Sequence, residues 1–140
     1  SVASNTASYG ASIDFPMFRL ADVYLMYAES VVRGGDGGDI STALGYINKL
    51  RERAYGNTDG DVKTTDLTKN FILDERAREL YMEGTRRTDL IRYGEFTTSD
   101  YLWQWKGGVK DGKTVNSKYN YYPIPQTELT ANPNLNNDNY

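Results

Sequence analysis

The sequence predicts a mainly α protein, an antiparallel helical bundle followed by long irregular loops. Between residues 20 and 92, apolar side chains recur in four stretches with the period of an amphipathic helix. Glycines follow these stretches, as is typical of helix ends. From residue 95 onward this period is replaced by aromatic residues, Pro, Asn and Gly. We expect one domain over residues 1–140, with residues 95–140 forming aromatic-rich loops and a tail.

The first helix is expected to begin near Leu20, after a polar, extended lead-in over residues 1–15. Its regularly spaced apolar positions are Leu20, Val23, Tyr24, Tyr27, Ala28 and Val31. The apolar residues that widen this stripe are Leu25, Met26 and Val32. We therefore expect the helix to be buried on two sides and to end at the glycines after Arg33.

The second helix should begin after Asp39, whose side chain can accept hydrogen bonds from the first free N–H groups. Its apolar positions are Ile40, Ala43, Leu44, Ile47, Leu50 and Ala54. Gly56 is expected to end it. Two such helices joined by a short glycine-rich turn should pack antiparallel, as in the tetratricopeptide-like hairpin.

Two further helices are expected after a polar loop over residues 57–66. The apolar residues of the third are Ile72, Leu73, Ala77, Leu80 and Tyr81. This helix is expected to end at Gly84, and a short fourth helix to run from Thr85 to Arg92.

Less regular structure is expected after Gly94. The alternation of Tyr101, Trp103 and Trp105, followed by an Asp-Gly pair at residues 111–112, predicts an irregular hairpin. The tail is rich in Pro and Asn, so we expect only one helical turn there, near residues 126–129.

Composition excludes several classes of function. The chain has no Cys and no His, so it lacks thiolate nucleophiles, Cys-ligated zinc and the usual general base near neutral pH. With 16 basic and 19 acidic residues, the formal net charge is -3, which argues against a nucleic-acid partner. No apolar run is long enough to span a bilayer. We expect no catalytic residue, no metal and no cofactor.

A column of like charges is predicted on the third helix. Glu75, Glu79 and Glu83 are spaced i, i+4 and i+8, where carboxylates repel by about 0.2–0.5 kcal/mol per pair. Arginines should therefore lie beside them. The candidates are Arg86 and Arg87 along the chain and Arg51 and Arg53 of the second helix.

Two interpretations of this column remain open. The first is a structural ion-pair network, whose members would be Glu75, Glu79, Glu83, Arg86 and Arg87. The second is the acid/base pair of a glycoside hydrolase, which needs two carboxyl groups with well separated pKa values. Several neighbouring arginines would hold all the carboxylates ionised and so favour the network.

Aromatic residues concentrate outside the expected helices. The chain has 12 Tyr, 4 Phe and 2 Trp, and the candidate glycan-binding residues are Tyr101, Trp103, Trp105, Tyr119 and Tyr121. Flat rings with polar edges suit the faces of pyranose sugars. The alternative is that these rings fasten an irregular segment against one end of the bundle.

Several motifs together resemble the C-terminal portion of the SusD-like proteins, the SusD/RagB family. They occur in the family's order at residues 19–29, 47–54, 72–92, 122–125 and 132–135. The most specific is Glu-Arg-x-x-Glu-Leu followed by Glu-Gly-x-Arg-x-x-Asp-Leu within residues 75–90. One departure lies at residues 136–140, where the family usually closes with Gln-Asn-Pro-Gly-Tyr.

The resemblance implies a non-enzymatic lipoprotein on the cell surface of the Bacteroidetes outer membrane. Such proteins capture an oligo- or polysaccharide and pass it to a SusC-like TonB-dependent transporter, and a lipid anchor on the full-length parent holds them to the membrane. Family members run to several hundred residues, so the resemblance implies a C-terminal fragment. The alternative is a helical scaffold that serves only protein–protein packing. Because the family's main glycan contacts lie upstream, none is carried onto this sequence.

Overall fold

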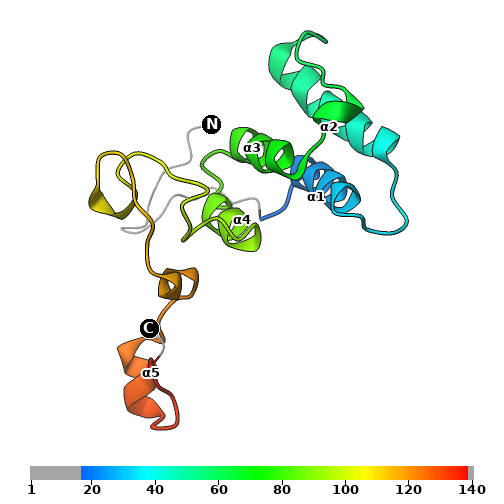
Figure 1. The fold of residues 1–140 in the computed structure, drawn as a ribbon. Helices are drawn as coiled ribbons and strands as arrows, with labels where there is room; N and C mark the ends of the chain where they lie inside the picture. The colour runs from blue at the N-terminus through cyan, green and yellow to red at the C-terminus, as the bar shows by residue number, and fades with distance from the viewer. Residues whose placement is uncertain (1–16, 139–140) are drawn as a thin grey trace, which may run out of the picture. The chain divides into compact units, whose positions relative to one another are not determined.

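The computed structural model describes residues 17–138, which form helices and loops without a strand (Figure 1). The α-helices are α1 (Leu20–Val32), α2 (Ile40–Tyr55), α3 (Lys69–Glu79), α4 (Arg86–Arg92) and α5 (Gln126–Ala131). Short 3-10 helices occur at η1 (Thr64–Asp66), η2 (Lys106–Gly108) and η3 (Ser117–Asn120). The mainly α prediction is confirmed, while the extended lead-in over residues 1–15 lies outside the described residues.

The chain divides into two compact units, Ser1–Glu79 and Leu80–Tyr140. The first contains α1, α2 and α3, and the second contains α4, α5 and the aromatic-rich loops. The expectation of one domain over residues 1–140 stays a prediction.

The hairpin of α1 and α2 is antiparallel, as the sequence predicts. Tyr24 stacks on Tyr46 with ring centroids 4.3 Å apart, and the Tyr27 hydroxyl accepts a hydrogen bond from the amide of Asp39, before α2 begins. Thus Tyr27, the later of these two tyrosines in α1, lies beside the start of α2, and the earlier one, Tyr24, lies further along α2. The fully buried large side chains of this unit are Leu25, Ile47, Ile72 and Leu73. They come from all three α-helices, so one core joins α3 to the hairpin.

Local signals in the sequence set the ends of this hairpin. The backbone amide and the hydroxyl of Thr42 donate to the Asp39 carboxylate at 2.8 and 2.6 Å, which caps α2. The hydrogen bond from the Thr42 hydroxyl is the largest of the influences that lower the pKa of Asp39. At the other end of α2, Gly56 takes a left-handed conformation with φ of 74°. Glycine adopts this conformation without strain because it has no Cβ atom.

Helix α1 is buried on one side by the other helices of the first unit. Ala21, Leu25 and Ala28 are buried and face the contacts with α2 and α3. Val23 and Met26 are about half exposed. Within the first unit, α2 and α3 together cover one face of α1, and burial on two sides stays a prediction.

Helix α3 ends at Glu79, five residues before the predicted Gly84. The amide of Glu83 donates to the carbonyl of Leu80 at 3.1 Å, a tight turn in place of the next helical hydrogen bond. Met82 has a left-handed φ of 67°. The apolar period continues through Leu80 and Tyr81, but the backbone has already left the helix.

No strand pair forms where the sequence predicts a hairpin, within the residues described. The amide of Trp105 does reach the carbonyl of Lys110 at 3.3 Å, and that of Lys113 reaches Lys106 at 3.1 Å. However, Trp105 is left-handed and the adjoining segment forms η2. The hairpin prediction is wrong because this turn curls the backbone where a strand must stay extended.

The tail has slightly more structure than expected. The predicted turn near residues 126–129 is confirmed as the start of α5. Beyond it, the Asn137 side chain bridges both backbone groups of Ile124: it accepts from the amide at 2.9 Å and donates to the carbonyl at 3.0 Å. These bonds fasten the end of the tail beside the start of α5.

Candidate functional site

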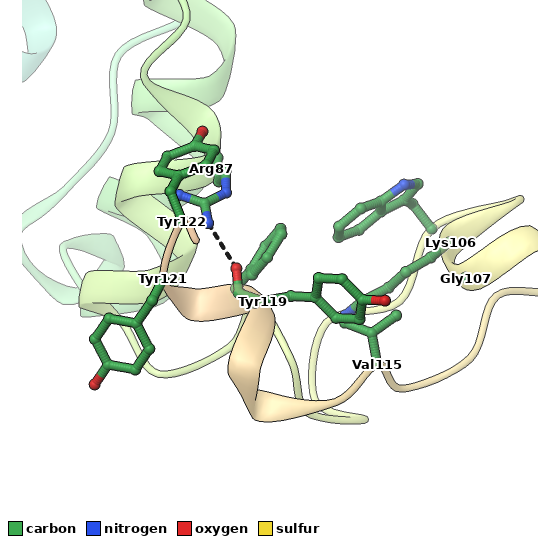
Figure 2. Close-up of a pocket in the computed structure, with 9 residues that line it drawn as sticks. Arg87, Lys106, Gly107, Val115, Tyr119, Tyr121 and Tyr122 are labelled. Carbon is green, nitrogen blue, oxygen red and sulfur yellow. Dashed lines mark hydrogen bonds between the residues drawn. The ribbon is translucent and has the colours of Figure 1, made fainter. Parts of the chain in front are cut away.

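A ring-lined pocket of about 510 Å³ lies within the second unit. Its lining comes from α4, from the loop around η2 and from the segment around η3. The lining residues are Arg87, Phe96, Trp103, Lys106, Gly107, Val115, Tyr119, Tyr121 and Tyr122 (Figure 2). Five of the nine carry aromatic rings and two carry positive charges, so the pocket combines flat apolar surface with cations.

Arg87 projects from α4 and lies among aromatic rings. Its guanidinium centre is 4.1 Å from the ring centroid of Tyr122 and 5.2 Å from that of Phe96. It also donates to the backbone carbonyl of Tyr119 at 2.6 Å, the dashed line in Figure 2. These contacts join α4 to the segment around η3 and fix the guanidinium in place.

Lys106 places a second cation in the pocket lining. The residue is only 3 % exposed, and its ammonium group donates to the carbonyls of Thr98 at 3.2 Å and Tyr101 at 2.7 Å. It also lies 4.7 Å from the ring centroid of Trp103. Burial lowers the pKa of Lys106, because the charged form loses contact with water.

Neither cation has a carboxylate partner within residues 17–138. Arg87 meets a carbonyl and two rings, and Lys106 meets two carbonyls and one ring. The lining itself contains no Asp or Glu. An ammonium has three N–H donors and a guanidinium five, so donors of both side chains are left for an additional acceptor.

The structure brings together three of the five aromatic residues predicted to bind a glycan. Trp103, Tyr119 and Tyr121 line the pocket, although the Tyr121 ring points away from Lys106 (Figure 2). Tyr101 lies outside the lining, where Arg86 covers its ring at 4.7 Å and donates to its hydroxyl. Trp105 is also outside it and is 65 % exposed.

Several pocket residues were not predicted to belong to a glycan-binding site. They are Arg87, Phe96, Lys106, Val115 and Tyr122. The sequence predicted Arg87 beside the glutamate column, whereas its guanidinium lies against aromatic rings of the second unit. Lys106 gave no signal in the sequence, because its acceptors are backbone carbonyls, which every residue carries.

A cluster of ion pairs occupies the first unit. Glu75 binds Arg51 at 2.8 Å and Arg78 at 2.6 Å. Glu79 binds Arg19 and Arg53, each at 2.5 Å. Both glutamate side chains are about 7 % exposed. Each carboxylate thus joins α3 to α2, and Glu79 also joins it to the residue that precedes α1.

The other members of the predicted network, Glu83, Arg86 and Arg87, follow the end of α3, and their part in an ion-pair network stays a prediction. Glu83 is beyond the end of α3, so the helical column contains only Glu75 and Glu79. Arg86 and Arg87 are at the start of α4, where the interactions described above involve the rings and the backbone of the second unit. The predicted i, i+8 column is corrected because the helix ends four residues too early to carry it.

The acid/base interpretation gains nothing from this geometry. A hydrolase pair needs one carboxyl that holds a proton, whereas Glu75 and Glu79 each meet two guanidinium groups.

No group of His, Cys, Asp and Glu able to hold a metal occurs among the residues described. None of the described helices is long and apolar enough to cross a membrane.

The fold defines the chain as a mainly α protein of the helical-hairpin class, with a ring-lined pocket in its second unit. More particularly, it belongs to the SusD family, which matches residues 1–140. It is 49% identical over 128 residues to the starch-binding protein SusD of Bacteroides thetaiotaomicron, which covers 91% of this chain. It is also 36% identical over 134 residues to SusD-like protein P25 of Formosa agariphila, with 94% of this chain covered.

A solved structure supports the same assignment. A SusD superfamily protein from Bacteroides vulgatus superposes with a TM-score of 0.64 at 30% identity, over 86% of this chain and 26% of its own. The chain spans 22% of the Bacteroides thetaiotaomicron relative and 25% of the Formosa protein. The matched region is therefore about a quarter of these relatives, and the family resemblance noted in the motifs is confirmed.

Proposed function

We propose that the protein is the non-catalytic glycan-binding component of an outer-membrane uptake system and works with a SusC-like TonB-dependent transporter. The observation that carries this proposal is the 49% identity to a starch-binding protein over 91% of the chain. Membership of the SusD family along the whole sequence supports it. The native protein would be a lipoprotein on the cell surface, held by a lipid anchor.

The ring-lined pocket is the part of this chain best suited to a sugar. Trp103, Tyr119 and Tyr122 offer flat ring faces, on which the C–H faces of a pyranose lose contact with water. Arg87 and Lys106 offer N–H donors to the sugar oxygens. The volume of about 510 Å³ lies in the range of about 300–1,000 Å³ typical of small-molecule sites.

Affinity electrophoresis tests the proposed function. The native protein that contains this sequence is run through gels that contain candidate polysaccharides, beside gels without polysaccharide. We expect at least one glycan that induces expression of the protein to slow its migration. When that glycan induces expression, a TonB-dependent transporter should copurify with the protein from outer-membrane fractions. Migration unchanged by every inducing glycan would contradict the proposal.

A scaffold role is the second candidate, and the exposed side of α1 favours it. Val23 and Met26 present apolar surface to solvent within the described residues, which suits packing against more protein. Under this alternative, Met26→Ser lowers the melting temperature of the native protein while no aromatic substitution in the pocket alters glycan retardation. Under the glycan-binding proposal, substitutions in the pocket alter retardation.

A further inference from the structure

The charge of the ring-lined pocket is unusual for a site that takes a neutral sugar. Two cations and no carboxylate line it. Neither Arg87 nor Lys106 has an acidic partner within residues 17–138, although burial of an unpaired charge is costly. An anionic occupant would complete the electrostatics of the pocket.

Both cations are held in fixed positions while some of their donors remain unused. Arg87 is held by one carbonyl and two rings, so its fork of N–H groups keeps its orientation. Two of the three Lys106 donors are occupied by Thr98 and Tyr101. A carboxylate accepts such charge-assisted hydrogen bonds more strongly than a neutral hydroxyl does.

The aromatic rings of the pocket indicate which kind of molecule would carry the negative charge. The ring of Trp103 lies beside the Lys106 ammonium group. Tyr119 lies on the same side of the pocket, and Tyr122 stacks on Arg87 (Figure 2). Flat aromatic faces complement the flat faces of a pyranose ring, whereas an extended acidic peptide has no such surface. The arrangement therefore favours an acidic sugar over an acidic peptide.

We infer that the ring-lined pocket binds an acidic sugar, a pyranose residue that carries a carboxylate or a sulfate ester. The inference rests on the proposed function, since it names the class of glycan at the same pocket. It goes beyond that function because starch, the ligand in the name of the 49% identical relative, is a neutral glucan. The anionic group lies beside Arg87 and Lys106, and the sugar ring lies against Trp103 or Tyr119.

Calorimetric titration of the native protein that contains this sequence tests this inference. Four ligands are compared: trigalacturonic acid, a sulfated galactan oligosaccharide, maltotriose and hexaglutamate. We expect at least one acidic sugar to bind about tenfold more tightly than maltotriose, a difference of about 1.4 kcal/mol. This advantage should shrink as the salt concentration rises to about 0.5 M, because salt screens the attraction. The two acidic sugars show which anionic group is preferred.

Matched variants locate the effect. Arg87→Gln removes one charge from the pocket and should abolish most of the advantage for acidic sugar, while Arg87→Lys keeps the charge and should retain most of it. Lys110→Gln removes an equal charge from an exposed position of the neighbouring loop, outside the lining, and should change nothing. Thermal melts of all three variants show whether each is folded.

Four results would overturn the inference. They are equal affinity for maltotriose and both acidic sugars, hexaglutamate binding as tight as the acidic sugars, equal losses from Arg87→Gln and Lys110→Gln, and the absence of sugar binding by the native protein. The proposed function is tested separately, because retardation of the native protein by a neutral polysaccharide would still support it.

Discussion

Two pairs of cationic side chains, one pair in each unit, have different partners. In the first unit, Arg51 and Arg53 reach the carboxylates of Glu75 and Glu79 on α3. In the second unit, Arg87 and Lys106 reach backbone carbonyls and aromatic rings. The first arrangement neutralises charge within the protein, and the second leaves positive charge at the lining of a pocket. The partner, rather than the residue type, distinguishes a structural cation from one available to a ligand.

Removal of a carboxylate from the first unit is expected to have the largest effect. Glu79→Gln leaves Arg19 and Arg53 without their common anion beside a side chain that is only 7 % exposed. We expect the free energy of unfolding to fall by about 2–4 kcal/mol, less than for a fully buried pair because Arg53 is 62 % exposed. Urea denaturation measures the change.

Glu52→Gln provides the control for this prediction. Glu52 lies on α2 next to Arg51 and Arg53 but is exposed. Its substitution should change the free energy of unfolding by no more than about 0.5 kcal/mol. Equal effects of the two substitutions would mean that the buried ion pairs contribute no more than solvated charge.

Removal of a cation from the second unit should cost less. Lys106→Met keeps the length of the side chain and its contact with Trp103, but deprives the carbonyls of Thr98 and Tyr101 of their donor. We expect a loss of about 1–2 kcal/mol, since the freed carbonyls lose one hydrogen bond each and water replaces it in part. Lys110→Met, at an exposed position of the same loop, should be neutral. Thermal melts of both variants measure these changes in stability. A loss for Lys106→Met larger than that for Glu79→Gln would contradict the expected difference between the two units.

Local signals made most of the first unit predictable from the sequence. The limits of α1 and α2 follow from Asp39, which caps one helix, and from the glycines that end both. Short-range chemistry decides these positions, so the sequence alone is sufficient. The end of α3 was not predictable in this way, because the apolar period runs on through Leu80 while the backbone turns at Met82.

The pocket was only partly predictable, for a different physical reason. The crowding of rings indicated Trp103 and Tyr119 as surface for a sugar. Arg87 and Lys106 were missed because their partners are carbonyls and rings up to 35 positions away in the sequence. Such contacts leave no periodic pattern, so the electrostatic character of the pocket emerged only from the folded chain.

A pair of tryptophan substitutions sharpens the distinction between packing and binding in the second unit. Trp103 lines the pocket and is 41% exposed, whereas Trp105 lies outside the lining and is 65% exposed. Trp103→Ala should weaken glycan binding about tenfold, or by about 1.4 kcal/mol, because the sugar loses the flat apolar face on which it lies. Trp105→Ala should leave affinity unchanged. Affinity electrophoresis of both variants, with thermal melts, makes the comparison.

The outcome separates the two interpretations of the aromatic segment. Lost affinity at an unchanged melting temperature supports a sugar site at Trp103. A large fall in melting temperature for Trp103→Ala, with affinity retained in the folded fraction, would instead indicate that the Trp103 ring serves packing of the irregular segment.

The smallest expected effect concerns pH and the cap of α2 in the first unit. The Thr42 hydroxyl and amide lower the pKa of Asp39 below the ordinary value of 3.8. Between the folded and unfolded pKa values the unfolded chain binds more protons, so stability rises with pH there. The contribution of the cap is fully present above the unfolded pKa and is lost as the pH falls through the folded pKa.

Comparison with Asp39→Asn isolates this contribution, because Asn also caps helices but does not titrate in this range. The difference in melting temperature between the original chain and the variant should be constant near neutral pH. The melting temperature of the original chain should fall relative to that of the variant as the pH drops below about 4, where the unfolded chain begins to bind a proton at Asp39. A difference that stays constant down to pH values well below this would show that Thr42 binds the protonated and ionised forms equally, and the cap would then be independent of charge.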